Sequence, residues 1–299
     1  MSVVLSALLI GLALGGLVVC AMAWSAAGVL IYPPKRPAEA TPRDYGIEFE
    51  PVSFDSRDGL TLRGWFIPAS HPKGAIVLCH GYAGDCSPDL IYAPFFHAAG
   101  YHTLLFDFRG HGASEGEFTS LVYWERGDLL AALDFLRARG IARVGLMGFS
   151  MGGAIAISTA PQSPMVVGVI SDCAFAELRS IVENAAVARG FPKWLAPLLG
   201  WLSVVFASVR LRANLFSADP LRWIAQIAPR PILLMHAGED RDVPVTQARK
   251  LFAAAREPKE LWIVPHAAHR QIEQVAREEY RRRVIDFFDR AFAADGETV

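Results

Sequence analysis

Residues 143–157, Arg-Val-Gly-Leu-Met-Gly-Phe-Ser-Met-Gly-Gly-Ala-Ile-Ala-Ile, place a serine between two glycines, where an apolar run gives way to small, helix-compatible residues. The run predicts a buried strand, and the residues after it predict a helix. Ser150 would then occupy a tight strand-to-helix turn, whose strained backbone exposes the hydroxyl. Such a turn requires neighbours without side chains, and Gly148 and Gly152 meet this requirement. Ser150 is therefore a candidate nucleophile, and a simple Gly-rich turn is the alternative.

A serine nucleophile needs a base within hydrogen-bonding reach and an acid that orients the base. The C-terminal third of the chain offers both, each directly after a short apolar run. The run 231–236 leads into Glu239, Asp240 and Asp242, and the run 261–265 leads into His266 and His269. The order along the chain is therefore serine, carboxylate, histidine.

Four motifs carry a resemblance to a known family: HGYAG at 80–84, DFRGHGAS at 107–114, the serine turn at 148–152, and DRDVP at 240–244 followed by His269. They occur in this order between about residues 75 and 270. The chain resembles serine hydrolases of the α/β-hydrolase superfamily, and it is similar to their esterase, lysophospholipase and monoacylglycerol-lipase-like branch.

The resemblance implies a role for each residue of a catalytic triad. Ser150 is the nucleophile, His269 is the general base and then the general acid, and Asp240 orients the imidazole. In the family the acid lies three residues before a Val-Pro pair, which here is 243–244. The other candidate acids are Asp242 and Glu239, for which a solvated loop charge is the alternative role, and Asp172, which could instead cap a helix or order a loop.

Acyl transfer also requires donors for the developing oxyanion. We expect the backbone N–H of Met151 to be one, because it begins a helix, and the backbone N–H of Tyr82 to be the second. His236 is interpreted as a satisfied interior histidine and His266 as an exposed one. In the 107–114 motif, Asp107 and Arg109 are expected to order a loop, and contact of Arg109 and His111 with an anionic substrate is the alternative.

Apolar runs predict eight strands, at about 50–55, 61–67, 75–79, 102–107, 143–148, 166–171, 231–236 and 260–265. Amphipathic patterns predict helices between the later strands, including 125–139 and 277–292. The first two strands lie close together and predict an antiparallel edge. The predicted fold class is α/β: an α/β-hydrolase fold with a mostly parallel eight-stranded sheet, helices on both faces and a small helical cap.

Residues 175–216 interrupt this alternation of strands and helices. Within them, residues 194–209 carry no charge and are rich in Trp, Leu, Val and Phe. This segment is shorter than the roughly 20 residues that a membrane span requires, so we expect a helical cap at about 175–216. In hydrolases of this kind the cap covers the serine and supplies an apolar acyl pocket; packing on the core alone is the alternative.

The N-terminus has no charged side chain before Lys35, and residues 3–31 are mostly Val, Leu, Ile, Ala and Gly. We expect a transmembrane anchor at 1–32, a linker at 33–48 and the hydrolase domain at 49–299. A signal peptide cleaved near Ala21-Met22-Ala23, followed by secretion, is the alternative. Basic residues follow the span, which favours a cytoplasmic hydrolase domain. The four cysteines form no obvious disulfide framework, and reduced thiols agree with a cytoplasmic domain.

Charge and motif content exclude other classes. With 29 basic and 30 acidic residues, the chain has no electrostatic footprint for nucleic acid. It has no Cys/His set with zinc spacing and no phosphate-binding loop, so we expect no metal and no cofactor. The oligomeric state is left open.

The sequence therefore predicts a membrane-anchored serine hydrolase that cleaves carboxylic esters through an acyl-enzyme. Its partner is a small-molecule or lipid-like acyl ester, for example a monoacylglycerol or a lysophospholipid. Thioester or peptide hydrolysis by the same triad is an alternative. A non-catalytic ligand-binding protein of this fold is an alternative of another class.

Overall fold

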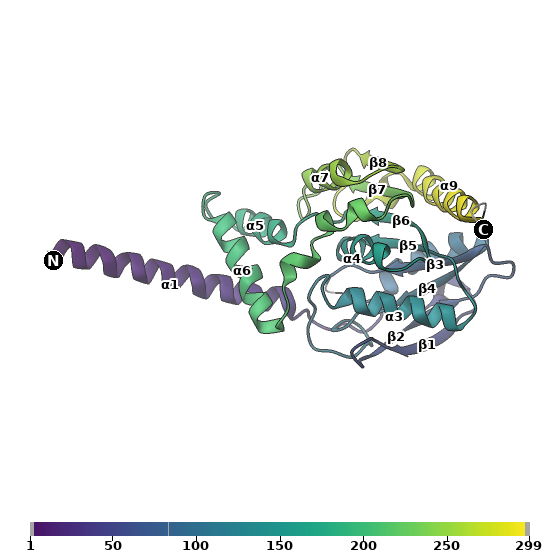
Figure 1. Ribbon diagram of the computed structural model, residues 1–299, viewed down its shortest axis with the longest axis horizontal. Coiled ribbons are helices and arrows are strands. Elements are labelled where there is room, and N and C mark those ends of the chain that lie inside the picture. Colours follow the sequence, from purple (N-terminus) through teal and green to yellow (C-terminus); the bar gives the residue numbers. More distant parts are fainter. Residues whose placement is uncertain (1–2, 83, 297–299) are drawn as a thin grey trace.

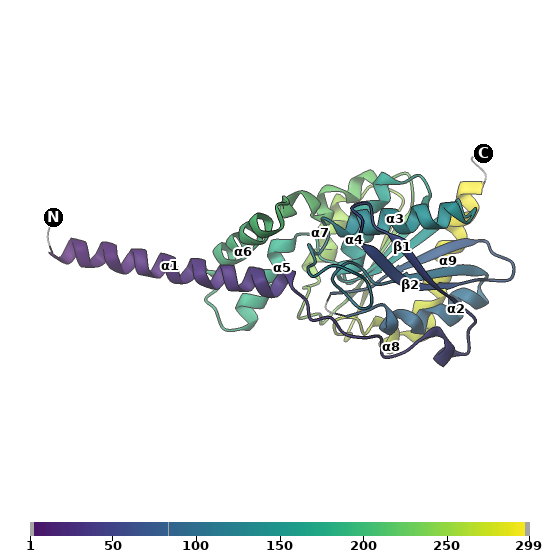
Figure 2. The same ribbon diagram turned by 90° about the horizontal axis from the view of Figure 1, so that it is seen from below.

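The computed structural model describes residues 3–82 and 84–296, in which one long helix protrudes from a sheet covered by helices on both faces (Figures 1 and 2). Ala83 of the 80–84 motif lies outside the described residues. So do residues 1–2 of the predicted anchor and 297–299 of the predicted hydrolase domain.

The sheet has eight strands in the order β1-β2-β4-β3-β5-β6-β7-β8. β2 is antiparallel to both of its neighbours, and the pairs from β4 to β8 are parallel. The strands are β1 (Glu50–Asp55), β2 (Thr61–Ile67), β3 (Gly74–Cys79), β4 (Tyr101–Phe106), β5 (Val144–Phe149), β6 (Val166–Asp172), β7 (Ile232–Ala237) and β8 (Lys259–Val264). The predicted fold class is confirmed, including the antiparallel edge, and every strand lies within one residue of its prediction.

Helices cover the sheet on both faces because its central strands are apolar on both sides. In β3, Ala75 and Val77 belong to one hydrophobic core, and Ile76 and Leu78 belong to the other. Side chains of α3, α4 and α7 complete the first core, and those of α2, α8 and α9 complete the second. These helices are α2 (Ala93–Ala98), α3 (Glu125–Ala138), α4 (Met151–Thr159), α7 (Thr246–Ala254), α8 (Ile272–Val275) and α9 (Arg277–Gly296).

The segment 175–216 contains α5 (Leu178–Ala188) and α6 (Ala196–Leu211), which pack against each other. Both lie beside the base of the protruding helix α1 (Val3–Ile31) (Figure 1). Among the described helices, α1 is the one that is long and apolar enough to cross a membrane.

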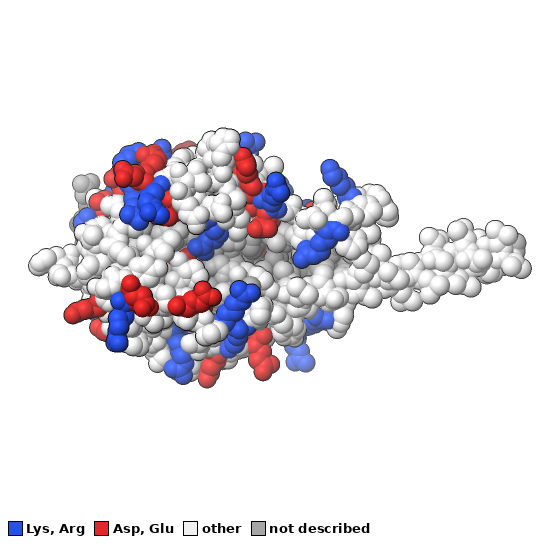
Figure 3. Space-filling view, turned by 180° about the vertical axis from the view of Figure 1, so that it is seen from behind, with Lys and Arg blue, Asp and Glu red and all other residues white. Residues whose placement is uncertain are grey.

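Helix α1 has a free half and a docked half. The first half projects away from the protein, and Figure 3 shows it without charged groups. In the second half, Ala23, Ala27 and Ile31 are fully buried at a spacing of four residues, and α6 packs against this half of the helix. The Arg210 guanidinium of α6 also lies 3.7 Å from the centre of the Trp24 ring. The docked half is therefore part of the folded structure.

Candidate active site

Ser150 lies between the end of β5 and the start of α4, with a backbone φ of +52°. Both flanking glycines are required by close backbone contacts. A Cβ on Gly148 would lie 2.2 Å from the Gly152 carbonyl oxygen, and one on Gly152 would lie 1.9 Å from that of Cys79. The tight strand-to-helix turn expected from the sequence is present.

The structure brings Ser150, His269 and Asp240 together. His269 Nε2 lies 3.0 Å from Ser150 Oγ, and His269 Nδ1 lies 2.6 Å from Asp240 Oδ2. With the proton on Nδ1, the imidazole donates to the carboxylate and accepts from the serine hydroxyl. The arrangement is that of a nucleophile, a base and an orienting acid, contributed by three loops that follow β5, β7 and β8.

Asp240 is itself held in place by backbone donors. Its Oδ1 accepts hydrogen bonds from the N–H groups of Asp242 and Val243, at 3.0 and 2.8 Å. The other candidate acids have different partners. The Asp172 carboxylate accepts a hydrogen bond from the Tyr280 hydroxyl at 2.7 Å, and Glu239 lies 2.9 Å from His266.

Of the two other histidines near the site, His266 is exposed and His236 is interior, as the sequence predicts, but His236 is not fully satisfied, because its Nδ1 has no hydrogen-bond partner among the described residues. The His266 side chain is 85% exposed. His236 is buried, and its Nε2 donates to the Val243 carbonyl oxygen at 2.8 Å. Burial lowers the pKa of His236, so it is a neutral interior group.

The two predicted oxyanion donors lie at the serine. Met151 is the first residue of α4, so its N–H has no acceptor within the helix. Met151 and Tyr82 both line the cavity that contains Ser150. The Gly81 backbone is close to the nucleophile, because a Cβ built on Gly81 would lie 3.7 Å from Ser150 Cβ.

The 107–114 motif orders loops beneath the site. The Asp107 carboxylate accepts from the N–H groups of Cys86 and Ala113, both at 2.8 Å. The buried Arg109 forms ion pairs with Asp128 and Asp58, each at 2.6 Å. The loop-ordering interpretation is supported, since these two carboxylates already hold the Arg109 guanidinium.

His80 fixes the start of the loop that contains Tyr82. Its Nε2 accepts from the Phe108 N–H at 2.9 Å, and its Nδ1 donates to the Gly81 carbonyl oxygen at 2.7 Å. This pattern requires the neutral ring. Burial lowers the pKa of His80 to about 4, which is consistent with that form.

The sequence did not predict an ion pair beside the triad between a buried Asp89 and an Arg270 side chain that is 25% exposed. Arg270, which directly follows His269, pairs with Asp89, and its guanidinium lies 4.3 Å from the centre of the Phe149 ring. Both charged residues line the cavity at Ser150. A Cβ on Gly81 would lie 3.6 Å from Arg270 Nη1, so the pair supports the loop before Tyr82. Nothing in the sequence pattern connects positions 89 and 270.

Cys173 also lies beside the triad. Cys173, Asp240 and His269 each offer one atom that could bind a metal ion, and these three atoms lie within 4.8 Å of one another. The Asp240 and His269 atoms are, however, already hydrogen-bonded to each other. Burial raises the pKa of the Cys173 thiol, which disfavours the thiolate that a metal would require. The group therefore suits a hydrogen-bonded triad better than a metal site.

A cavity of about 900 Å³ opens at Ser150 and His269. Its size is that of a small-molecule site. Helices α1, α5 and α6 contribute most of its apolar lining: Met22, Ala26, Val29, Leu30, Ile181, Val182, Ala185, Ala186 and Leu199. The docked half of α1 was not expected at this site.

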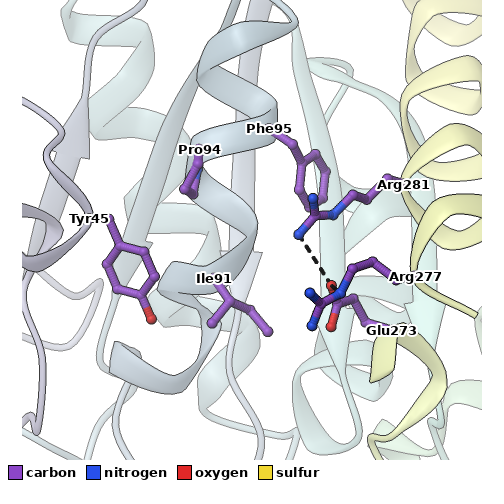
Figure 4. A pocket seen from close by; sticks show the side chains of 7 residues that line it. All are labelled: Tyr45, Ile91, Pro94, Phe95, Glu273, Arg277 and Arg281. Atoms are coloured by element: carbon purple, nitrogen blue, oxygen red, sulfur yellow. Dashed lines mark hydrogen bonds and ion pairs between the residues drawn. The ribbon is translucent and has the colours of Figure 1, made fainter. Parts of the chain in front are cut away.

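A second hollow, of about 470 Å³, lies between α2 and α9 (Figure 4). Its charged groups pair with one another: the nearly buried Glu273 lies 3.1 Å from Arg277 and 3.3 Å from Arg281. The opposite wall is formed by Tyr45, Ile91, Pro94 and Phe95. These ion pairs hold α8 and α9 together.

A family model described as "Serine aminopeptidase, S33" matches residues 70–229. The chain belongs to this family. The match spans β3 to the loop before β7 and includes Ser150. Among curated proteins, the chain is 32% identical over 228 residues to the uncharacterised protein Rv2307c of Mycobacterium tuberculosis, covering 73% of this chain and 71% of the relative. It is 28% identical over 237 residues to the uncharacterised protein YqkD of Bacillus subtilis, covering 77% and 76%.

Solved structures agree with the family. The esterase Pf2001 of Pyrococcus furiosus matches with a TM-score of 0.72 and 26% identity, covering 87% of this chain and 98% of the esterase. An esterase from Exiguobacterium antarcticum matches with a TM-score of 0.59 and 18% identity, covering 80% and 99%, and shows the shared fold. This S33 family member is thus a hydrolase of the α/β-hydrolase superfamily.

Proposed function

We propose that this S33 family member is a serine esterase that cleaves carboxylic esters through an acyl-enzyme. The observation that carries the proposal is the continuous chain of hydrogen bonds from Ser150 through His269 to Asp240, beside a largely apolar cavity that Ser150 and His269 line. A protein that only binds a ligand has no need of an aligned nucleophile, base and acid. The non-catalytic alternative is therefore disfavoured.

In the proposed mechanism, His269 Nε2 takes the hydroxyl proton as Ser150 Oγ attacks the ester carbonyl. The Asp240 carboxylate holds the imidazole in the required tautomer and stabilises the imidazolium. His269 then delivers the proton to the leaving alcohol, which leaves the acyl group on Ser150. A water molecule, activated by the same imidazole, releases the acid and restores the serine.

The backbone N–H groups of Met151 and Tyr82 would stabilise the oxyanion. Such donors typically contribute about 3 to 4 kcal/mol each to transition-state stabilisation. The Met151 donor lies at the N-terminus of α4, where the helix dipole favours negative charge.

An amphipathic acyl ester, such as a monoacylglycerol or a lysophospholipid, suits the cavity best. The cavity lining combines charged groups, including Asp85, Arg241 and Asp242, with a mostly apolar part from α1, α5 and α6. An ester with a polar head and an apolar chain suits such a mixed lining. Thioesters and peptides could use the same triad, and the family description makes an aminoacyl substrate the competitor to include in the assay.

We propose that α1 is retained as a membrane anchor, within the domain limits 1–32, 33–48 and 49–299 expected from the sequence. Cleavage after Ala23 would remove Met22 from the cavity wall and Ala23 from its contact with the cap helices. Residues 3–21 precede the docked half and extend about 28 Å as a helix, close to the roughly 30 Å of a bilayer core. Lys35, Arg36 and Arg43 follow the span and favour a cytoplasmic hydrolase domain.

The surface of the cap supports a position at the membrane. Leu198, Trp201 and Val209 lie on one face of α6, and Trp194 lies in the turn just before this helix; all four are between 47 and 79% exposed. The stretch 187–213 also contains Arg189, Lys193, Arg210 and Arg212 and no acidic residue. Exposed tryptophans flanked by basic residues are typical of helices that lie in the interface of an anionic membrane.

A fluorophosphonate probe tests the esterase proposal. The full-length protein in detergent should be labelled, whereas Ser150→Ala should not, with folding of both checked by circular dichroism. Unlabelled wild-type protein is then assayed with p-nitrophenyl esters of increasing acyl length, a thioester and an aminoacyl p-nitroanilide. A folded wild type that neither reacts with the probe nor turns over an ester would reject the proposal. A preference for the anilide would identify a peptidase.

A further inference from the structure

We propose that the docked half of α1 forms the wall along which the acyl chain lies, so that the anchor helix also sets chain-length specificity. This inference rests on the proposed esterase function. It names the substrate class of that site: an ester whose acyl chain is taken from the membrane in which α1 is embedded.

The first argument is the face that α1 presents to the cavity. Met22, Ser25, Ala26, Val29 and Leu30 line the same cavity as Ser150. Their spacing of three and four residues places them on one side of the helix. An adjacent side, with Ala23, Ala27 and Ile31, is buried. The cavity wall is therefore a regular helical surface and not an accidental gap.

The second argument is that this wall is fixed to the catalytic loops. Val29 is four residues before Pro33, which has no N–H, so the Val29 carbonyl lacks its normal donor within the helix. The Tyr82 hydroxyl donates to that carbonyl oxygen at 2.6 Å. The Thr119 N–H likewise donates to the Ile31 carbonyl oxygen at 2.8 Å. The hydrolase fold thus completes the end of α1.

The third argument is the part of the lining that α5 and α6 contribute, which is mostly apolar and also includes Asn184 and, at the end of α5, Arg189. Ile181, Val182 and Ala185 of α5 line the cavity, with Leu199 of α6. Ser203 of α6 also lines it, is fully buried, and has a hydroxyl without a hydrogen-bond partner among the described residues. An unpartnered hydroxyl facing a cavity is available to a polar group of a ligand.

The fourth argument is the direction of the cavity. From Val29, which contacts Tyr82, to Met22 the helix advances about 10 Å, away from the catalytic loops and toward the free half (Figure 1). An acyl chain lying along this wall has its carbonyl at Ser150 and its tail toward the end of α1 that projects from the protein. If that end is in a bilayer, the chain reaches the serine along the anchor.

The experiment is a chain-length profile of the full-length protein in detergent with Ala26→Trp, which adds bulk to the wall. Acetate, butyrate, octanoate and dodecanoate p-nitrophenyl esters are compared. We expect kcat/KM for the two longer esters to fall about 10-fold or more relative to acetate, because apolar pockets discriminate on this scale. Leu12→Trp is the matched control on the free half and should leave the profile unchanged, since Leu12 is 66% exposed.

The outcomes separate this inference from the proposed function. A wild type without ester turnover or probe labelling contradicts the esterase function itself. An active Ala26→Trp variant with the wild-type profile overturns the inference alone. If Ala26→Trp loses activity on acetate as well, the inference is tested with Met22→Ala instead. This substitution enlarges the cavity beside Met22 and should raise the rate for dodecanoate relative to acetate. A chain-length profile identical to that of wild type would overturn the inference.

Discussion

The Tyr82 hydroxyl and the Val29 carbonyl oxygen are 2.6 Å apart, which joins a loop beside Ser150 to the last turn of α1. The backbone N–H of the same tyrosine is the proposed second oxyanion donor. One residue therefore connects the position of α1 with the geometry at the serine. Its hydroxyl and its amide can be tested separately, because substitution by phenylalanine removes only the hydroxyl.

Tyr82→Phe should lower kcat for a short ester about 5-fold. A net hydrogen bond of this kind contributes about 1 kcal/mol, and its loss frees the loop to move the amide. Steady-state kinetics with p-nitrophenyl acetate measures the effect. Tyr32→Phe is the control and should have no effect, since Tyr32 directly follows the docked end of α1 and is 53% exposed. Equal rates for all three proteins would show that the contact does not position the loop.

His269→Ala should reduce kcat by about 10⁴-fold or more, because Ser150 loses the base to which its hydroxyl is hydrogen-bonded. His266→Ala should stay within about twofold of wild type, since that ring is exposed and lies beside Glu239. Both are measured by ester hydrolysis. The reverse pattern would overturn the assignment of the base.

Gly152→Ala should strongly destabilise the protein, because the new methyl group would lie 1.9 Å from the Cys79 carbonyl oxygen. Overpacking against backbone typically costs about 1 to 3 kcal/mol or more. Gly127→Ala is the matched control. It lies in α3, and nothing is within 4 Å of its Cβ position, so it should stabilise the helix by about 0.5 to 1 kcal/mol. Urea unfolding in detergent measures the change in stability of each variant. Equal changes for Gly152→Ala and Gly127→Ala would contradict the close approach of residue 152 to the Cys79 carbonyl group.

Arg270→Met should cost about 3 to 5 kcal/mol of folding stability, because it leaves the buried Asp89 carboxylate unpaired. The double variant with Asp89→Leu should be more stable than Arg270→Met alone, since both charges are then removed. Denaturant unfolding of the single and double variants measures the coupling. If the stability loss of the double variant equals the sum of the losses of the two single variants, Arg270 and Asp89 do not act as a unit.

The contribution of His80 to stability should be lost as the pH falls from about 6.5 to about 4. Burial lowers the pKa of His80 to about 4, below the usual 6.5, so in this interval the unfolded chain binds the proton first and acid favours unfolding, by about 3 kcal/mol for this residue. Burial raises the pKa of Asp128 and of Asp219 to about 6, which opposes this loss in the whole protein. His80→Gln should therefore lose less stability in acid than wild type, whereas the exposed His97→Gln should match wild type. Urea midpoints at several pH values decide, and identical pH profiles for His80→Gln and wild type would contradict the prediction.

The strands could be predicted because each buried strand carries its own local signal. The run 166–171, for example, is apolar without alternation, as expected for a strand covered on both faces, and it forms β6. The candidate triad could be found for a similar reason. Ser150 and Asp240 each lie in a short motif, the former between Gly148 and Gly152 and the latter before Val243.

Other features depend on contacts between distant segments that leave no local pattern. Arg270 and Asp89 look like ordinary charged residues in the sequence, and only the fold brings them together. The docking of α1 is hidden for another reason. A helix that is apolar on all sides has no periodicity to mark the flank that packs on α6, so Ala23 and Ala27 look the same as their exposed neighbours.

The contact between α1 and α6 also imposes an order of assembly. During synthesis the first helix leaves the ribosome long before residues 196–211 exist, and domains form from the N-terminal side as the chain emerges. Ala23, Ala27 and Ile31 therefore stay without their packing partner α6 until that helix has been translated. The contact between α1 and α6 therefore forms late in the folding of the new chain. The cavity at Ser150 is complete once this contact has formed.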